Sequence, residues 1–165
     1  MIILAIDPGN EQSAWVILDT SSLELLAKGQ EDNKQVRALL PNRLQAFKVQ
    51  LVVIEMVASY GMPVGKTVFE TCVAIGRFHE IAEPRVDLVT WAYRLDVKLA
   101  ICQDSRAKDA NIRQALLDLY PPSGGGSTPQ IGTKKEPGPL YGVSKDIWAA
   151  LAVGVFASKK YGGIL

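Results

Sequence analysis

The sequence predicts an α/β fold with a mixed five-stranded sheet, three antiparallel strands followed by two parallel ones, flanked by helices. Two observations carry this prediction. Residues 2–6 and 51–54 are near-continuous apolar runs, which are typical of strands buried on both faces. Residues 13–19 and 23–29 alternate apolar and polar side chains, as strands with one exposed face do.

The remaining elements follow from helical spacing and from turn residues. Residues 32–47 have apolar side chains at every third or fourth position, which predicts a helix crossing over to the strand at 51–55. The last helix is apolar nearly all round, so we expect it in the core. The expected bounds after the second apolar run are helix 67–82, strand 86–89, helix 91–101 capped by Thr90, helix 108–119, and helix 145–159 capped by Ser144.

A long segment rich in Gly, Ser and Pro precedes the last helix, over residues 121–139. Its composition is typical of a flexible connection. Loops of this length are uncommon in compact domains unless they have a function. The segment is therefore a candidate functional loop.

The composition is that of an ordinary globular protein, with 165 residues, 48% hydrophobic and 21% charged, and we expect a single domain over residues 1–165. No apolar run reaches the roughly 20 residues that span a bilayer, and Met1 leads directly into the first strand, so we expect a cytoplasmic protein without membrane contact. The net charge of +1 does not by itself indicate a nucleic-acid partner.

Histidine and cysteine usage excludes some kinds of site. The single histidine, His79, rules out a multi-histidine zinc site and makes a Ser-His-Asp triad improbable. Cys72 and Cys102 have no Cys-x-x-Cys spacing and lie in apolar helical surroundings. We therefore expect both cysteines to be reduced core residues.

Two acids stand at the ends of the two buried apolar runs. Asp7 follows the first run and Glu55 follows the second. A buried carboxylate is costly unless a cation or a proton neutralises it. If the two strands are neighbours, both acids lie within reach of one hard divalent ion. The alternative is that the acids are unrelated and face water or cap nearby helices. Asp146 in the first turn of the last helix is a third candidate, although an acid there also compensates the helix dipole.

Six sequence blocks, in order along the chain, resemble the RuvC-type Holliday-junction resolvases, and most of all the versions carried by phages and prophages. The blocks are AIDPGN, VIEMVASYGMPVGK, KDANIRQAL, GTKK, PGPLYG and WAALAV, which begin at residues 5, 53, 108, 132, 137 and 148. The family has the ribonuclease H-like fold, whose order of elements agrees with the one predicted above. The resemblance implies a crossover junction endodeoxyribonuclease that hydrolyses phosphodiester bonds in four-way DNA junctions, with other branched DNA as further candidate substrates, and that acts as a homodimer.

The resemblance also implies a metal site. By position in the blocks, Asp7 and Glu55 are catalytic metal ligands. Asp146, two residues before the last block, stands where the family has the first acid or histidine of a pair on its last helix, and completes the catalytic metal ligands. Carboxylates suit two Mg²⁺ or Mn²⁺ ions per active site. The family has a further acid or histidine three residues after the position of Asp146, where this chain has Ala149. Either three acids suffice with water completing the shell, or another acid reaches in, or the chain is a weakened or inactive junction-binding protein. The other acids to consider are Glu70, Asp104 and Asp109.

Candidate DNA contacts lie outside the acidic cluster. An aromatic ring in the loop after Glu55 can stack on an unpaired base, although it can equally close a small core under that loop. The basic candidates can hold phosphates or form a solvated surface. On the second helix, an apolar stripe is a candidate dimer face. The DNA candidates are Tyr60, Lys66, Lys108, Arg113, Lys134 and Lys135, and the stripe is Val68, Cys72, Ile75 and His79.

A strand followed by Asp-x-Gly also opens the phosphate-binding subdomain of actin-like ATPases and sugar kinases. Those proteins need a second such subdomain and an adenosine loop, for which 165 residues leave no room. The sequence therefore favours the nuclease.

Overall fold

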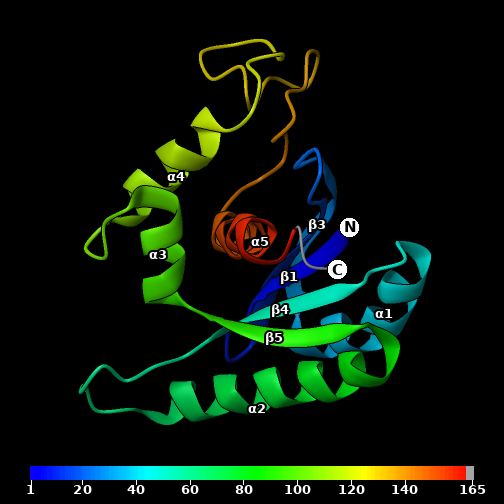
Figure 1. The fold of residues 1–165 in the computed structure, drawn as a ribbon, viewed down its shortest axis with the longest axis vertical. Coiled ribbons are helices and arrows are strands. Elements are labelled where there is room, and N and C mark those ends of the chain that lie inside the picture. Colours follow the sequence, from blue (N-terminus) through cyan, green and yellow to red (C-terminus); the bar gives the residue numbers. More distant parts are fainter. Residues whose placement is uncertain (163–165) are drawn as a thin grey trace.

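A computed structural model of the chain describes residues 1–162, which build a five-stranded sheet in the order β3-β2-β1-β4-β5 (Figure 1). The strands β1, β2 and β3 pair antiparallel, whereas β4 pairs parallel with β1, and β5 pairs parallel with β4. The predicted mixed sheet is therefore confirmed. The strands are β1 (Ile2–Asp7), β2 (Gln12–Asp19), β3 (Leu25–Asp32), β4 (Leu51–Met56) and β5 (Leu88–Tyr93).

Helices cover both faces of the sheet (Figure 1). The helices are α1 (Asn33–Ala46), α2 (Lys66–Ala82), the short 3-10 helix η1 (Glu83–Arg85), α3 (Arg94–Cys102), α4 (Asp109–Asp118) and α5 (Ile147–Tyr161). One apolar cluster lies between the sheet and α1 with α2, and the other lies between the sheet and α5 with α3 and α4. Within residues 1–162, no helix has the length and apolarity needed to cross a membrane.

The helix α5 is buried over most of its length and packs across β1 and β2. A small residue allows this close approach. A Cβ atom at Gly154 would lie 2.3 Å from Cδ2 of Leu18 and 3.4 Å from Cβ of Ala5. Because Asp146 directly precedes α5, the packing at Gly154 also sets the position of that acid relative to the sheet.

We expect Gly154→Ala to lower the free energy of unfolding by about 1–2 kcal/mol, because the added methyl overlaps the Leu18 side chain by more than the helix propensity of Ala compensates. The control is Gly76→Ala on α2, where an added Cβ meets no atom within 4 Å. The control should leave stability unchanged or raise it by about 0.5–1 kcal/mol. Urea unfolding of both variants measures the difference, and equal stabilities would contradict the close approach.

The main correction to the predicted elements concerns β5 and α3. Trp91 and Tyr93 pair with β4 as strand residues, so the strand continues to Tyr93 and α3 begins at Arg94. Thr90 therefore lies within the strand and caps no helix. Continuous pairing with the buried strand β4 outweighs the local capping preference of Thr90. The shift places Arg94 directly at the carboxyl end of β5.

The predicted burial of the cysteines is wrong for Cys72, which is exposed, while Cys102 is half-buried and packs against the core. The helix α2 buries Ala74, Ile75 and Phe78 toward the sheet. Cys72 lies on the opposite side of the helix. Since α2 has apolar residues on both sides, an apolar sequence context does not show which of its residues are buried.

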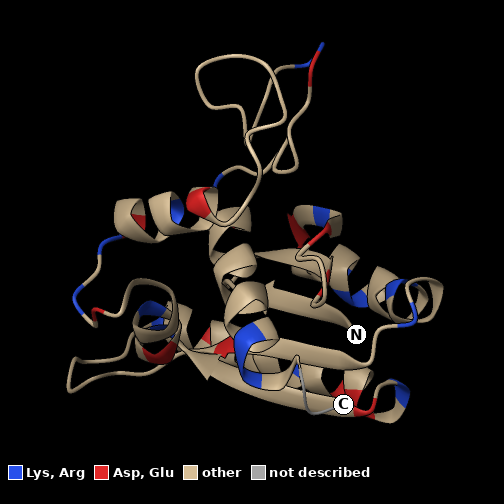
Figure 2. Cartoon of the chain, turned by 45° about the horizontal axis from the view of Figure 1, so that its top comes forward, with Lys and Arg blue, Asp and Glu red and all other residues tan. Residues whose placement is uncertain are grey.

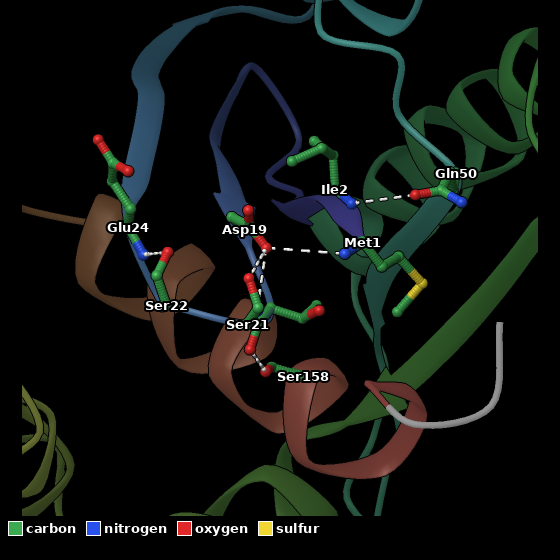
Figure 3. A network of polar contacts seen from close by, with 9 residues as sticks. Met1, Ile2, Asp19, Ser21, Ser22, Glu24, Gln50 and Ser158 are labelled. Carbon is green, nitrogen blue, oxygen red and sulfur yellow. Dashed lines mark hydrogen bonds and ion pairs between the residues drawn. The ribbon is translucent and has the colours of Figure 1, made fainter.

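A network of hydrogen bonds and an ion pair lies at the end of the sheet where β1 begins (Figure 3). The amino terminus of Met1 lies 3.6 Å from Oδ1 of Asp19. The backbone N–H and the hydroxyl of Ser21 also donate to that oxygen, at 2.9 and 2.8 Å. These donors hold the pKa of Asp19 below its ordinary value. Ser158 of α5 donates to the carbonyl oxygen of Thr20 at 3.3 Å, so the network also ties α5 to the β2–β3 turn.

Candidate functional site

The sheet register brings Asp7 and Glu55 side by side. Ile6 of β1 pairs with Ile54 of β4, so the next residue of each strand lies at the same level. Side chains alternate along a strand. Ala5 in β1 belongs to the cluster under α5, and Ile6 to the opposite cluster. Asp7 therefore shares the α5 face with Ala5, and Glu55 shares it by the same alternation along β4.

The two carboxyl groups are partly withdrawn from water, and this raises their pKa values. Burial is the main cause for Asp7, whose pKa rises from 3.8 to about 8, and the charges of Glu55 and Asp146 raise it further. Burial also raises the pKa of Glu55, against the opposing effect of Arg94. Oε2 of Glu55 is buried and has no hydrogen-bond partner among residues 1–162. An acidic pair with an unpartnered buried oxygen fits a bound cation.

Arg94 is the site residue that the sequence reasoning missed. Its Nη1 lies 3.8 Å from Oε1 of Glu55, and its Nη2 donates to Oδ1 of Asp109. Arg94 therefore joins the end of β4 to the start of α4. The available signal was the strand pattern of residues 88–93, which places the next residue at the carboxyl edge of the sheet.

Asp146 lies at the amino-terminal end of α5, where it is the N-cap residue in place of the predicted Ser144. Its Oδ2 accepts a hydrogen bond of 2.8 Å from Nε2 of Gln30 on β3. Its charge contributes to the raised pKa of Asp7, so the third predicted acid lies near the pair. Ala149 is half-buried and lines a cavity of about 110 Å³ together with Asp146 and Arg94.

Hydrogen bonds fix the turn that carries Asp7. The buried hydroxyl of Ser13 donates to Oδ1 of Asn33 at 2.6 Å and accepts from the backbone N–H of Gly9 at 3.2 Å. Nδ2 of Asn33 donates to the carbonyl oxygens of Gly9 and Asn10. A Cβ atom at Gly9 would lie 2.4 Å from the carbonyl oxygen of Gln12, so only glycine fits there. The end of β1 is therefore held by the start of α1.

The loop between β4 and α2 forms a wall of the main cavity at the site. Asp7, Glu55, Tyr60 and Arg94 are among the residues that line this cavity of about 480 Å³. Tyr60 has a φ of 45° within a tight turn and is 62% exposed. Positive φ is uncommon for a bulky residue, so the turn holds the ring in solvent at a conformational cost. The structure thus leaves no core for Tyr60 to close.

The other basic candidates have different surroundings. Arg113 lies over the Trp148 ring at 5.0 Å and lines the small cavity beside Asp146. Lys108 is the exposed N-cap residue of α4. Lys66, the first residue of α2, is exposed and forms an ion pair of 3.5 Å with Glu70. None of these side chains contacts Asp7 directly in the described part of the chain.

Residues 121–146 build an ordered arm, which corrects the prediction of a flexible segment. Backbone hydrogen bonds close it, including Gly124 N–H to Pro129 O at 2.8 Å and Gly138 N–H to Ile131 O at 2.9 Å. A turn over residues 133–136 lies at its tip, where Thr133 N–H donates to Glu136 O at 2.9 Å. The arm rises away from the sheet and has basic and acidic residues at its tip (Figure 2). Lys134 and Lys135, within the turn over residues 133–136, are exposed. Glycine makes this compact path possible.

The alternative acids have different surroundings. Asp109 is held by Arg94 next to the site, whereas Glu70 pairs with Lys66 on the other face of the sheet. Asp104 accepts a hydrogen bond from the backbone N–H of Arg106. Within residues 1–162, no three side chains of Asp, Glu, His or Cys are arranged to hold one ion between them.

This chain is similar to known proteins in its structure, whereas comparisons of its sequence give no match. No family model matches the sequence, and no curated protein matches it. The structure of Thermus thermophilus RuvC aligns with a TM-score of 0.74 at 16% identity, over 99% of this chain and 97% of that chain. A second structure, T. thermophilus RuvC in complex with a Holliday junction substrate, aligns with a TM-score of 0.72 at 16% identity, over 99% of this chain and 96% of that chain.

The chain has the RuvC fold. The likeness extends over nearly the whole of both chains, so it includes the arm and α5 as well as the sheet. This agrees with the ribonuclease H-like fold that the sequence predicts. The likeness to versions carried by phages and prophages stays a prediction.

We expect Asp7→Asn to stabilise the metal-free protein in a pH-dependent way. Because folding raises the pKa of Asp7 from 3.8 to about 8, the folded state keeps a proton that the unfolded state releases in this range. Stability of the wild type therefore falls as the pH rises through this window. The variant should be more stable by about 1–3 kcal/mol near pH 9 and nearly equal to the wild type near pH 4.

Urea unfolding in the presence of a chelator, at several pH values, measures this difference. Asp19→Asn is the contrasting control, because the pKa of Asp19 is lowered by its hydrogen bonds from Ser21. Asp19→Asn should therefore be less stable than the wild type at pH values above the ordinary pKa of an aspartate, where the ionised Asp19 stabilises the fold. A difference between Asp7→Asn and wild type that does not change with pH would contradict the raised pKa.

Proposed function

We propose that the chain is a metal-dependent endonuclease of the RuvC type that cleaves four-way DNA junctions by phosphodiester hydrolysis. The observation that carries the proposal is the pair Asp7 and Glu55, side by side at the carboxyl ends of two parallel strands and next to the start of α5, within the RuvC fold. The Thermus thermophilus protein with this fold is described in complex with a Holliday junction substrate.

The metal of this proposal is Mg²⁺ or Mn²⁺, held by Asp7 and Glu55 with Asp146 nearby. Hard divalent ions prefer carboxylate oxygens, and the unpartnered buried oxygen of Glu55 supplies one. Such ions stabilise charge on a phosphate under attack and lower the pKa of a bound water. The two ions per site expected from the sequence stay a prediction. The protein's own part is to hold the carboxylates at one level through the strand register.

DNA contacts in this proposal come from the main cavity, from α4 and from the arm. Tyr60 offers an exposed ring at the main cavity. Arg113 and Lys108 offer positive charge along α4, and the arm offers Lys134 and Lys135 at its tip. Phosphate contacts of this kind give affinity that falls as salt rises. Lys66 is the weakest candidate, since Glu70 already neutralises it.

A second function, junction binding without cleavage, is favoured by one specific observation. Ala149 stands where the family has a further ligand, and Asp146 is engaged by Gln30. Cleavage of a synthetic four-way junction in Mg²⁺ or Mn²⁺ separates the two functions. Forks and flaps in the same assay report on the other branched substrates.

We expect Asp7→Asn and Glu55→Gln each to lower the rate of junction cleavage by at least about a hundredfold, because each removes a ligand charge at nearly constant size. Junction binding in a gel-shift assay should be unchanged. Asp87→Asn is the control, since Asp87 is an exposed acid next to the opposite end of the sheet. Cleavage at near the wild-type rate by either site variant would contradict the proposed metal site.

Exposed apolar side chains on α2 and the edge strand β5 favour a homodimer. Phe69 and Val73 of α2 are 60% and 51% exposed, and Trp91 of β5 is 44% exposed. The rings of Trp91 and His79 lie 5.4 Å apart, which joins the two elements into one surface. The predicted stripe requires a correction, because Ile75 is buried against the sheet. We propose that a second copy of the chain covers Phe69, Cys72, Val73, His79 and Trp91, as symmetric cutting of a two-fold junction requires.

We expect Val73→Asp to convert a dimer at micromolar concentration into a monomer, because a carboxylate on a two-fold face meets its own copy. Light scattering after size-exclusion chromatography measures the mass. Leu39→Asp is the control, since Leu39 is similarly exposed on α1, outside this surface. A wild type that stays monomeric with and without junction DNA would contradict the dimer.

A further inference from the structure

Arg94 is in contact with two acids from different parts of the fold. Its Nη2 is bound by Asp109, while its Nη1 lies 3.8 Å from Glu55, which is an ion pair but too long for a hydrogen bond. The Arg94 side chain is 29% exposed and that of Asp109 is 86% exposed. A guanidinium has five N–H donors, so Arg94 keeps donors that neither acid uses.

The position of Arg94 connects two cavities. It lines the main cavity of about 480 Å³ with Asp7 and Glu55. It also lines the smaller cavity of about 110 Å³ beside Ala149 and Asp146. The guanidinium thus lies between the acidic pair and the place where a carboxylate at position 149 would extend the ligand set.

This placement has an electrostatic consequence for metal binding. A fixed positive charge about 4 Å from a ligand carboxylate opposes a divalent cation on that side of the carboxylate. Asp109 is neutralised by the same guanidinium, and Ala149 supplies no charge at all. The side of the pair facing α4 therefore has a protein cation, and its remaining acid, Asp146, already accepts a hydrogen bond from Gln30.

We propose that Arg94, held by Asp109, takes the place of a second metal ion in this site, so that the chain binds one divalent ion on Asp7 and Glu55. The inference rests on the proposed function, replaces the two ions per site expected from the sequence by one, and gives Ala149 an explanation. Arg94 is a positioning residue of the acidic pair in the free protein. It also lines the main cavity, where a DNA phosphate would lie in the proposed function and would accept from its unused donors.

The test is a titration of the full-length protein with Mn²⁺ in the absence of DNA, followed by electron paramagnetic resonance of free Mn²⁺ and by calorimetry. The wild type should bind one ion per chain. Arg94→Ala should bind Mn²⁺ about tenfold more tightly, because the repelling charge is gone. Arg94→Lys should restore affinity close to that of the wild type.

Arg85→Ala is the matched control, since Arg85 donates to the carbonyl oxygen of Ile81 at the end of α2 and forms no ion pair within the described residues. Its Mn²⁺ affinity should equal that of the wild type. The double variant Arg94→Ala/Ala149→Asp should bind two ions per chain, because it removes the cation and supplies the carboxylate. If Arg94 had only a structural role, Arg94→Ala would lower both the melting temperature and the Mn²⁺ affinity.

The outcomes separate this inference from the proposed function. A wild type that binds two ions and cleaves junctions overturns the role of Arg94 and leaves the nuclease intact. An unchanged or weaker Mn²⁺ affinity of folded Arg94→Ala also overturns it. A wild type that binds no Mn²⁺ and cleaves no junction overturns both. In junction cleavage at saturating Mn²⁺, Arg94→Ala should lose at least about tenfold in kcat while Arg94→Lys keeps most of it.

Discussion

The parallel pairing of β1 with β4 is the constraint on which the rest of the site depends. The register that aligns Ile6 with Ile54 also places Asp7 and Glu55 at one level on one face. Two carboxyl groups partly withdrawn from water repel each other and lose hydration. This electrostatic cost falls at the carboxyl end of two otherwise apolar strands, and two effects reduce it. Asp7 is protonated in the metal-free protein, and the guanidinium of Arg94 forms an ion pair with Glu55.

The elements around the acidic pair are held by packing and by hydrogen bonds. Gly154 lets α5 approach the sheet, and the Ser13–Asn33 hydrogen bond holds the turn after Asp7. Asp146 is positioned through Gln30 on the far strand β3. Each of these contacts comes from a different element, so the positions of the acidic side chains depend on the packing of the whole domain.

The apolar runs were sufficient to predict the strands, because burial and alternation are local properties of sequence. They predicted the pair Asp7 and Glu55 only on the condition that the two strands are neighbours, which the pairing of β1 with β4 fulfils. The end of β5 was not predictable in this way, since Thr90 is a good helix cap and only pairing with β4 extends the strand past it. Arg94 was missed for the same reason. The order in the arm was also hidden, because glycine-rich composition is shared by flexible loops and by compact ones closed through backbone hydrogen bonds.

The arrangement of surfaces gives the proposed dimer a simple geometry. The exposed face of α2 lies on one side of the sheet, whereas the arm and α4 lie on the other side (Figure 1). If two copies meet through α2 and β5, their arms point away from each other, and each acidic pair lies between the shared face and its own arm. A four-way junction has DNA arms that diverge from a two-fold centre. The tip with Lys134 and Lys135 would then follow a different DNA arm in each copy, while Tyr60 lies on the loop that leads into α2, the helix of the proposed shared face.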